Sequence, residues 1–518
     1  MIKPAIFNPK KNGRIFLWGF LAFYLLFAFL TFRDYGITCD EPDWYVSGGA
    51  LIKHYLHIGK DDNGRITGNE ESAYSCVYPA VLRVFSPSDD PERLHLLNLL
   101  FGGLGFLAIF EMLFAAYGNG LWALAGPLAL FLTFRFSGDM PANPKDGPFA
   151  VLFLACLALI FLFRSRWKDR GWEALVLGSF IGVTACARTV GLTLLPLWAF
   201  YRFYQYWTDE KRPSLDRWLS KEWVNGLLLF TTSQFWMMVF WPYLGGDYFG
   251  NYLSILQSSR RFAWDGAIMF MGKVVQSTHL PWYYMPGWFL VTMPLFLLVF
   301  FGLSWFFFKR MKKPARDLFV LLGGALVLQV VLYLALKPVL YNALRHYLFL
   351  VPPFCVMAVM GLVESLKGGW PLPWKRTMLA LSALNVLALV VQLVQLYPYQ
   401  YIYFNELVGG LKGAAGKYET DYWGASLKEA AQWLSNNGAP DLARTYRVRT
   451  CSTREQQTHY FKDNLKGDNE MKDADYRIEP NNPVVLERDH VSNQEIQAET
   501  IYVVQREGVP LYYVLKLK

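Results

Sequence analysis

The chain has 518 residues, of which 54% are hydrophobic, 17% aromatic and 18% charged, and its formal net charge is +9. A soluble protein of this length carries about 25% charged residues, so the composition excludes a soluble enzyme, a disordered chain and a disulfide scaffold. The positive charge does not indicate nucleic-acid binding, because the Lys and Arg residues flank apolar blocks instead of gathering on one folded face.

Apolar blocks of about 20 residues predict a polytopic α-helical membrane protein with about eleven transmembrane helices. In chain order the predicted spans are about 14–32, 96–116, 120–135, 148–165, 173–189, 190–206, 223–243, 287–308, 317–337, 346–364 and 377–396. The first span is too long for a signal-peptide core and no small-x-small cleavage site follows it, so we expect it to remain as an anchor.

Basic residues at alternate span ends predict the orientation. If the N-terminus is cytoplasmic, the short loops on that side hold clustered Lys and Arg residues, whereas the opposite loops are longer and mixed in charge. These inner clusters are Lys3 to Arg14, Arg164 to Arg170, Lys211 to Lys221, Lys309 to Lys313 and Lys367 to Arg376. An odd number of spans then places the C-terminus outside. We expect a multi-pass protein of the bacterial cytoplasmic (inner) membrane, with its C-terminal domain periplasmic or extracellular.

The first external loop, about 33–93, brings carboxylates to the membrane boundary. Asp40, Glu41 and Asp43 follow the first span closely and precede a helix-like stretch, Trp44 to Ile58. Asp40 is a candidate catalytic base, and an equally open alternative is that it only caps this helix. Cys39 and Cys76 share the loop, and whether they form a disulfide stays open.

The second external loop, Ser137 to Pro148, is rigid and polar, because three prolines restrict its backbone. Its candidate site residues are Asp139, Asn143, Lys145 and Asp146. Asp146 alternatively suits an N-cap position, since Pro148 would stand in the first turn of the next span. Lys145 has no such structural explanation.

Further cations and aromatic residues lie at outer span ends. Arg188 and Arg345 suit a phosphate group, although a single interfacial arginine can simply extend toward lipid headgroups. Tyr283, Tyr284 and His346 lie on the same side. The histidines match no metal-binding spacing. No cofactor is certain, and a divalent cation is possible if Asp40, Glu41 and Asp139 converge.

These residues would suit transfer of a sugar from a lipid phosphate. The departing lipid phosphate is stable as an anion that Lys or Arg can hold. The acceptor hydroxyl instead needs a carboxylate to take its proton, an effect of roughly 10²- to 10⁴-fold in rate.

Five segments, in this order and all on the outer side, resemble motifs of bacterial GT-C membrane glycosyltransferases. The segments are Thr38–Pro42, Asn143–Phe149, Pro281–Tyr284, Tyr341–His346 and Pro398–Asn405. The closest resemblance is to glycosyltransferase family 39, which includes protein O-mannosyltransferases and lipid A aminoarabinose transferases. The resemblance extends to about residues 421–424.

This resemblance implies an inverting hexosyl or pentosyl transferase with a polyprenyl-phosphate-linked sugar donor and a lipid, glycan or protein acceptor. It implies a base or acceptor-positioning role for Asp40, with Glu41 as its neighbour. The implied donor-phosphate contacts are Lys145, Arg345, Tyr283, Tyr284 and Arg188, and the implied substrate-positioning residues are Asp139, Asn143, Asp146 and His346. The eukaryotic protein mannosyltransferases have His-Pro where this chain has Asn143-Pro144, so the acceptor type stays open.

The composition predicts two domains, a transmembrane catalytic domain over 1–410 and a small extracytoplasmic α/β domain over 411–518. A capping-box pattern at Ser426 to Glu429 predicts a helix that ends at Gly438. Strands are predicted at Tyr446–Cys451 and Ala474–Ile478, and a hairpin at Thr500–Gln505 and Leu511–Leu517. Without a nucleophile or metal motif, we expect a lid, acceptor-docking or assembly role for this domain.

Two other functions are compatible with a polytopic chain. A transporter or flippase of an anionic glycolipid predicts charges buried in mid-span and internal repeats, and neither stands out in the sequence. A non-catalytic subunit of an envelope complex would tolerate amide substitution at Asp40 to Asp43. Membrane lipids are expected partners of the chain in every case, and nucleic acid is not.

Overall fold

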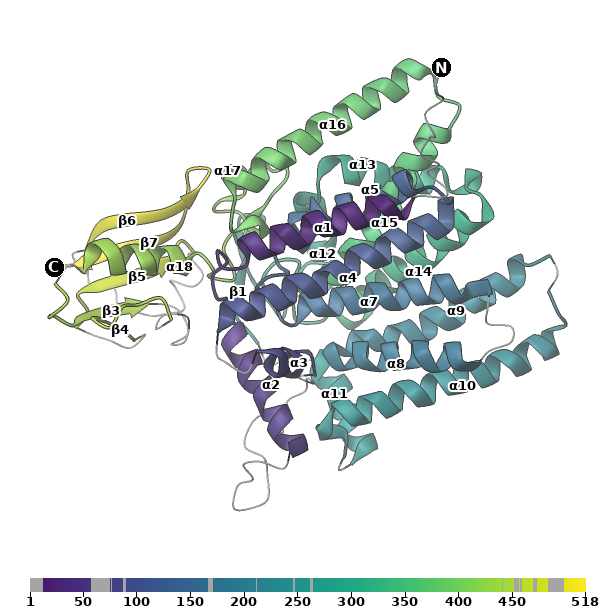
Figure 1. Cartoon of the computed structure of the whole chain (residues 1–518), viewed down its shortest axis with the longest axis horizontal. Helices are drawn as coiled ribbons and strands as arrows, with labels where there is room; N and C mark the ends of the chain where they lie inside the picture. The colour runs from purple at the N-terminus through teal and green to yellow at the C-terminus, as the bar shows by residue number, and fades with distance from the viewer. Residues whose placement is uncertain are drawn as a thin grey trace.

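The computed structural model describes residues 13–56, 75, 77–86, 90–165, 171–210, 212–245, 247–260, 264–439, 441–450, 456, 459–468, 473–482 and 498–518. The protein is mostly helical, and a C-terminal β-sheet domain lies beyond one end of the helical bundle (Figure 1). The candidate disulfide between Cys39 and Cys76 involves a residue outside these ranges, so it stays untested.

The longest α-helices coincide with the predicted apolar blocks, whereas several shorter ones lie outside them. In chain order the α-helices are α1 (Arg14–Thr31), α2 (Glu41–Leu56), α3 (Val77–Phe85), α4 (Pro91–Tyr117), α5 (Gly120–Phe131), α6 (Phe134–Ser137), α7 (Asp146–Leu162), α8 (Gly171–Ala187), α9 (Leu194–Thr208), α10 (Leu215–Phe240), α11 (Tyr248–Arg260), α12 (Tyr284–Thr292), α13 (Leu295–Phe306), α14 (Lys313–Leu336), α15 (Val351–Lys367), α16 (Leu372–Gln395), α17 (Gly410–Ala414) and α18 (Leu427–Trp433).

Short 3-10 or π-helical turns join several of these helices. They are η1 (Phe163–Ser165), η2 (Thr189–Thr193), η3 (Pro242–Gly245), η4 (Phe308–Arg310), η5 (Arg345–Leu350), η6 (Gln400–Ile402) and η7 (Leu434–Gly438). A hairpin of β1 (Ala267–Phe270) and β2 (Lys273–Gln276) lies between α11 and α12.

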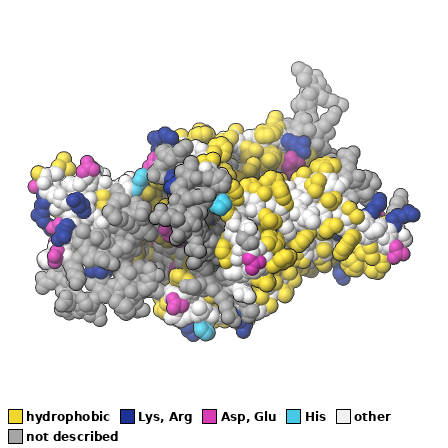
Figure 2. Space-filling view, turned by 90° about the horizontal axis from the view of Figure 1, so that it is seen from below, with side chains coloured by type: hydrophobic (Ala, Val, Ile, Leu, Met, Phe, Trp, Pro, Cys, Tyr) yellow, Lys and Arg dark blue, Asp and Glu magenta, His cyan; other side chains and the backbone are white. Residues whose placement is uncertain are grey.

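The chain is a multi-pass membrane protein. Among the described residues, five helices are long and apolar enough to cross a membrane, namely α1, α4, α14, η5 with α15, and α16, and the bent pair α12 and α13 makes up to six. Every predicted span coincides with helix, but the number eleven stays a prediction. Hydrophobic side chains cover much of the bundle surface, whereas charged side chains gather on the C-terminal domain and at the far end (Figure 2).

The predicted span 287–308 is not one straight helix. It breaks into α12 and α13, which are bent by 119°. Pro294 precedes α13, and a proline disfavours helical backbone in the residue before it, Met293. Asn405 donates hydrogen bonds from Nδ2 to the carbonyls of Leu290 (2.7 Å) and Met293 (2.8 Å), which the break leaves without helical partners.

The C-terminal domain contains a five-stranded mixed sheet in the order β4-β3-β5-β7-β6. The strands are β3 (Tyr446–Thr450), β4 (Leu465–Asp468), β5 (Tyr476–Pro480), β6 (Ala498–Arg506) and β7 (Val509–Leu517). The hairpin of β6 and β7 was predicted, but β4 was not. β3 is parallel to both β4 and β5, and the other two pairs are antiparallel.

The predicted capping box of α18 is wrong. The Ser426 side chain makes no capping hydrogen bond to the helix backbone, and its hydroxyl donates to Asp421 instead. The helix also continues as the π-helical turn η7 before it ends at Gly438. The domain boundary at residues 410 and 411 stays a prediction.

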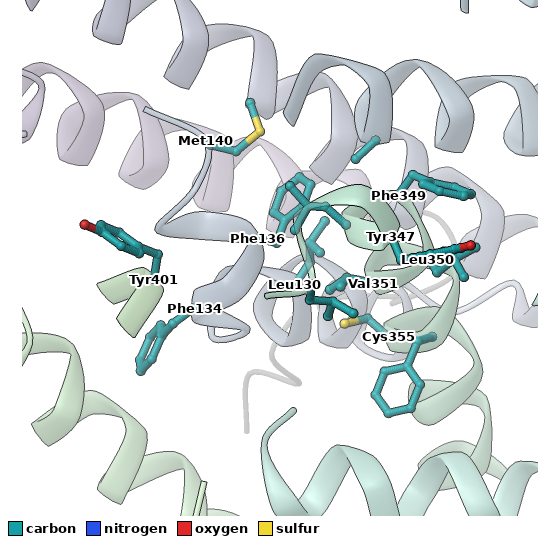
Figure 3. Packing of buried hydrophobic residues seen from close by; sticks show 14 of the residues in the cluster. Leu130, Phe134, Phe136, Met140, Tyr347, Phe349, Leu350, Val351, Cys355 and Tyr401 are labelled. Carbon is teal, nitrogen blue, oxygen red and sulfur yellow. The ribbon is translucent and has the colours of Figure 1, made fainter. Parts of the chain in front are cut away.

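A packed hydrophobic core lies at the end of the bundle that carries the second external loop. Side chains from α6, that loop, η5, α15 and η6 belong to it, including Phe136, Met140, Phe349 and Tyr401 (Figure 3). Thr38 Oγ1 also donates to the Ala142 carbonyl at 2.9 Å, which joins the first two external loops. This packing sets the backbone positions of Asp146 and Arg345, which begin α7 and η5.

Candidate functional site

A cluster of ion pairs at one end of the bundle brings together residues from four separate segments. Arg345, which begins η5, donates from Nη2 to Asp40 Oδ2 at 2.7 Å, and its Nε lies 3.4 Å from Asp146 Oδ2. Asp146 begins α7 and also accepts from Arg188 Nε at 2.6 Å, and Arg188 directly follows α8. Arg345 is therefore shared between two carboxylates, and Asp146 between two arginines. The structure thus gathers four of the predicted residues.

The four side chains differ in exposure. The Arg345 and Asp146 side chains are 3% and 2% exposed, whereas that of Asp40 is 33% exposed. Within the described part of the chain, Arg345 Nη1 and Nε are buried without a hydrogen-bond partner. Asp40 is thus the carboxylate of this cluster that a substrate can reach, and Arg345 keeps hydrogen-bonding capacity beside it.

Asn143 shapes the backbone that presents Lys145 and Asp146. Its Oδ1 accepts from the backbone N–H of Asp146 at 2.8 Å and of Lys145 at 3.3 Å. It thereby satisfies donors at the start of α7, which is the capping role that we predicted as the alternative for Asp146. The Asp146 side chain pairs with arginines instead.

Lys145 lies against the first external loop. Its Nζ is 4.2 Å from the centroid of the Trp44 ring, which α2 presents one turn after Asp40. Burial and the charges of Arg188 and Arg345 lower the pKa of Lys145 well below its usual value, and Asp146 and Asp40 oppose that shift only in part. An anion entering beside this side chain would raise its pKa again.

A strained turn aims Arg345 into the cluster. Asn342 and Ala343 have positive φ angles of 54° and 60°, and this conformation costs a residue with a Cβ roughly 1–2 kcal/mol. Tyr284 donates to the Ala343 carbonyl at 3.4 Å, and the backbone N–H of Ala343 donates to Glu419. Burial raises the pKa of Glu419 to about 8. Tyr284, predicted as a phosphate contact, thus supports the turn before Arg345.

The segment that leads into the C-terminal domain completes the site. Trp423 donates from Nε1 to Asp139 Oδ1 at 2.8 Å, and its backbone carbonyl accepts from Cys39 N–H at 3.1 Å. The Arg345 guanidinium lies 4.5 Å from the centroid of the Trp423 ring. Burial raises the pKa of Asp139 to about 7, although its bond to Trp423 opposes that rise. Trp423 therefore contacts both external loops and the arginine.

Arg135 lies behind Asp139 and is 1% exposed. It donates to Tyr422 Oη at 3.3 Å, and Tyr422 in turn donates to Asp139 at 3.3 Å. Its guanidinium also lies within 5.7 Å of three aromatic ring centroids, those of Trp288, Phe404 and Tyr422. Arg135 therefore supports the second loop from within the bundle.

Glu41 is separated from Asp40 although the two are adjacent in the chain. It is 0% exposed and accepts from Thr38 N–H (2.6 Å), Tyr45 Oη (2.7 Å) and His95 Nε2 (2.8 Å). With three donors around it and no exposed surface, Glu41 is placed to hold the loop instead of meeting a substrate. The catalytic role predicted for Glu41 alongside Asp40 stays a prediction.

The two remaining predicted residues, Tyr283 and His346, differ in their surroundings. Tyr283 is 42% exposed before α12. His346 packs its ring 4.8 Å from that of Tyr341, and its Nδ1 makes no hydrogen bond within the described residues. Asp40, Glu41 and Asp139 have separate partners, and across the ranges that the structure describes no group of three or more His, Cys, Asp or Glu side chains could hold a metal ion.

Sequence reasoning missed Trp423, Tyr422, Glu419, Arg135 and His95 as parts of the site. Arg135 stands at the end of the predicted span 120–135, and a charge in an apolar block is a recognised functional signal. The Trp423 segment was noticed only as the end of a resemblance. The roles of Glu419 and His95 depend on which distant residues they meet, and no local pattern carries that information.

The site combines a reachable carboxylate with several basic groups. Three basic side chains, Arg188, Arg345 and Lys145, face two carboxylates, Asp40 and Asp146. Such an arrangement can hold one further anion close to a base. Unpaired N–H groups on Arg345 give that anion specific donors.

No protein-family model matches the chain, and no curated protein does either. Among solved structures, the chain is similar to ArnT from Cupriavidus metallidurans bound to undecaprenyl phosphate, with 13% identity and a TM-score of 0.52 over 97% of this chain and 98% of that chain. The apo state of the same protein matches with 13% identity and a TM-score of 0.52 over 96% and 98%. The Archaeoglobus fulgidus oligosaccharyltransferase matches with 12% identity and a TM-score of 0.45 over 83% and 62%.

Proposed function

We propose that this multi-pass membrane protein, which has the GT-C fold, transfers a sugar from a polyprenyl-phosphate-linked donor to an acceptor hydroxyl. The reaction would take place at the outer face of the cytoplasmic membrane, with inversion at the sugar carbon. The observation that carries the proposal is the pairing of Asp40, the reachable carboxylate, with Arg345, a buried arginine that has unpaired N–H groups.

The donor phosphate would bind to the cationic side of the cluster. Arg345 and Arg188 can donate to its oxygens, and Lys145 adds a positive charge once protonated. As the bond between sugar and phosphate breaks, negative charge grows on the departing lipid phosphate. Preorganised cationic donors stabilise that charge, and removing one such donor typically costs about 10²- to 10³-fold in rate.

Asp40 would act as the base for the acceptor. Its carboxylate accepts a hydrogen bond from Arg345 at 2.7 Å. A bound phosphate would compete for the same guanidinium and leave the Asp40 carboxylate to accept the hydroxyl proton. The new bond would form on the sugar face opposite the phosphate, since a single displacement inverts that carbon.

The support for this proposal is the fold together with the chemistry of the cluster. ArnT, which shares the fold over almost its whole length, is a protein crystallised with undecaprenyl phosphate. The same kind of lipid phosphate suits the basic side chains of the cluster, Arg188, Arg345 and Lys145. The sugar, the acceptor and the prenyl chain are specified by neither the fold nor the cluster.

The decisive experiment is Asp40→Asn in reconstituted membranes supplied with a polyprenyl-phosphate sugar and a panel of lipid, glycan and peptide acceptors. We expect transfer to fall by about 10²- to 10⁴-fold while the donor still binds, because the amide cannot take the proton. Asp43→Asn is the matched control, one turn into the same loop helix, and should keep wild-type transfer. Transfer at the wild-type rate by Asp40→Asn would contradict the proposal.

A further inference from the structure

A buried carboxylate and imidazole lie beneath the site, and the proposed reaction does not use either of them. Glu41 and His95 are both 0% exposed, and His95 Nε2 lies 2.8 Å from Glu41 Oε1. A carboxylate accepts hydrogen bonds, so the imidazole nitrogen facing it is the donor. Isolating these polar groups from water is costly, and well-packed apolar residues would stabilise the fold as well or better. Stability alone therefore does not explain the pair.

Glu41 closes the turn that carries Asp40. Its carboxylate accepts from the backbone N–H of Thr38 at 2.6 Å, three residues earlier, and Asp40 lies within that closed turn. The Asp40 carbonyl then accepts from Trp44 N–H at 3.3 Å, which begins the hydrogen bonds of α2. The direction of the Asp40 side chain therefore depends on where the Glu41 carboxylate is held.

His95 fixes the Glu41 carboxylate to α4, a long helix within the bundle. One turn further along the same helix, Asn98 donates from Nδ2 to the Pro141 carbonyl at 2.7 Å. Pro141 belongs to the second external loop, which also supplies Lys145. Two adjacent turns of α4 thus hold the two loops whose side chains form the site, one through His95 and the other through Asn98.

From this arrangement we propose that His95 is a positioning residue, which acts through Glu41 to aim Asp40 at the acceptor. The inference rests on the proposed function. Loss of the hydrogen bond from His95 would let the start of α2 shift against α4, and a misplacement of about 1 Å can cost about 10²-fold in rate. The donor phosphate would still bind, because its cationic contacts are Arg188 after α8, Arg345 in η5 and Lys145 in the second loop.

The test compares three substitutions of His95 in the full-length protein in membranes. His95→Gln keeps an amide donor that reaches as far as Nε2, whereas His95→Asn is too short and His95→Leu has no donor. We expect kcat to fall by about 10²-fold in His95→Leu and His95→Asn, and to be largely restored in His95→Gln. Binding of the unreactive product, polyprenyl phosphate, should be unchanged in all three.

A matched control removes a neighbouring buried hydrogen bond that is not connected to Glu41. Tyr24 donates to the Leu99 carbonyl of α4 at 2.7 Å, and Tyr24→Phe deletes only that bond. It should leave kcat unchanged. A fall in kcat for Tyr24→Phe as large as that for His95→Asn would mean that any damage around α4 slows transfer, and it would overturn the specific role of His95.

A double substitution separates positioning from general damage. In the Asp40→Asn background, His95→Asn should cause no further loss of residual transfer, because the group that it aims is already disabled. An additional loss of the same size as in the wild-type background would overturn the proposal. Full transfer by Asp40→Asn alone would contradict the proposed function, whereas a slow Asp40→Asn with a fast His95→Asn and His95→Leu contradicts only the role of His95.

Discussion

Two buried arginines lie at opposite ends of α7, and they differ in the hydrogen-bond partners around them. Arg345 lies with Asp146 at the start of α7, whereas Arg202 on α9 donates to the Arg164 carbonyl just after the end of α7. Arg202 also makes a bidentate pair with Glu222, at 3.1 Å and 2.5 Å, and donates to Gln205 at 2.8 Å. Arg202 is matched by one carboxylate and donates to three different residues, while Arg345 has two buried nitrogens, Nε and Nη1, without a hydrogen-bond partner among the described residues.

By cavity size alone, the Arg202 end would be the better candidate for a binding site. A cavity of about 820 Å³ is lined by Arg202 and Glu222, together with several aromatic residues of α9 and α10. The cavities beside Asp139 and Lys145 hold only about 10 Å³ each. The comparison shows that an apolar groove beside a saturated ion pair offers little to a charged substrate. Unsatisfied donors, and not cavity volume, are the reason that we place the candidate site at the Arg345 end.

The strongest test of the comparison replaces each arginine separately. Arg345→Met should reduce transfer by about 10²- to 10³-fold, because it removes donors that the proposed donor phosphate needs. Arg202→Met should leave the kcat and KM of correctly folded protein unchanged, since Arg202 already has its full set of protein acceptors. Initial rates with purified, reconstituted protein, normalised to the folded fraction, measure both effects. Equal losses of transfer in the two variants would remove the functional distinction between the two ends.

A second test concerns stability at the Arg202 end. Arg202→Met leaves Glu222 buried without its partner, and breaking such a pair by removing one member costs about 3–5 kcal/mol. The double variant Arg202→Met/Glu222→Met should recover most of that loss, because it removes the isolated charge as well. Denaturant unfolding in detergent micelles gives both values. A double variant no more stable than the single one would mean that the pair itself contributes the stability.

The smallest expected effect is a dependence of donor binding on pH. Burial, Arg188 and Arg345 depress the pKa of Lys145, and a bound anionic phosphate would raise it toward its usual value. Binding then takes up a proton in the interval between the two pKa values, so donor affinity should fall as pH rises through that interval. Direct binding of the donor, measured from neutral to alkaline pH, would reveal this decline.

Lys145→Arg is the control for that dependence. An arginine side chain stays protonated throughout the same interval, so the decline in affinity should disappear. The persistence of the same decline in Lys145→Arg would assign it to another group, and Asp139, with a pKa raised to about 7, would be the first to examine.

The sequence predicted the residues of the cluster better than their individual roles. Asp40, Asp146, Arg188 and Arg345 were all selected because they stand at outer span ends, and span ends on one side of a membrane must lie at similar depth. The same reasoning grouped Glu41 with Asp40. It could not foresee that Glu41 turns into the protein, because that depends on His95, 54 positions further along the chain.

Local patterns were least reliable where long-range partners compete for a side chain. Ser426 has the pattern of a helix cap, yet its hydroxyl donates to Asp421. Asp146 was a candidate cap, but its carboxylate pairs with two arginines, and Asn143 accepts the hydrogen bonds from the backbone N–H groups instead. In each case a stronger acceptor or a charged partner overrides a capping bond, which typically contributes about 1 kcal/mol.

The sequence by itself determined the membrane character of this protein and the candidate residues at its outer loops, because hydrophobic length and charge placement are local properties of the chain. The tertiary structure alone decided which carboxylate faces outward, which arginine keeps unpaired donors, and that Trp423 and Glu419 complete the site. These features depend on contacts between residues up to several hundred positions apart. Ion pairing, burial and exposure are properties of such contacts, and no segment of the chain carries them alone.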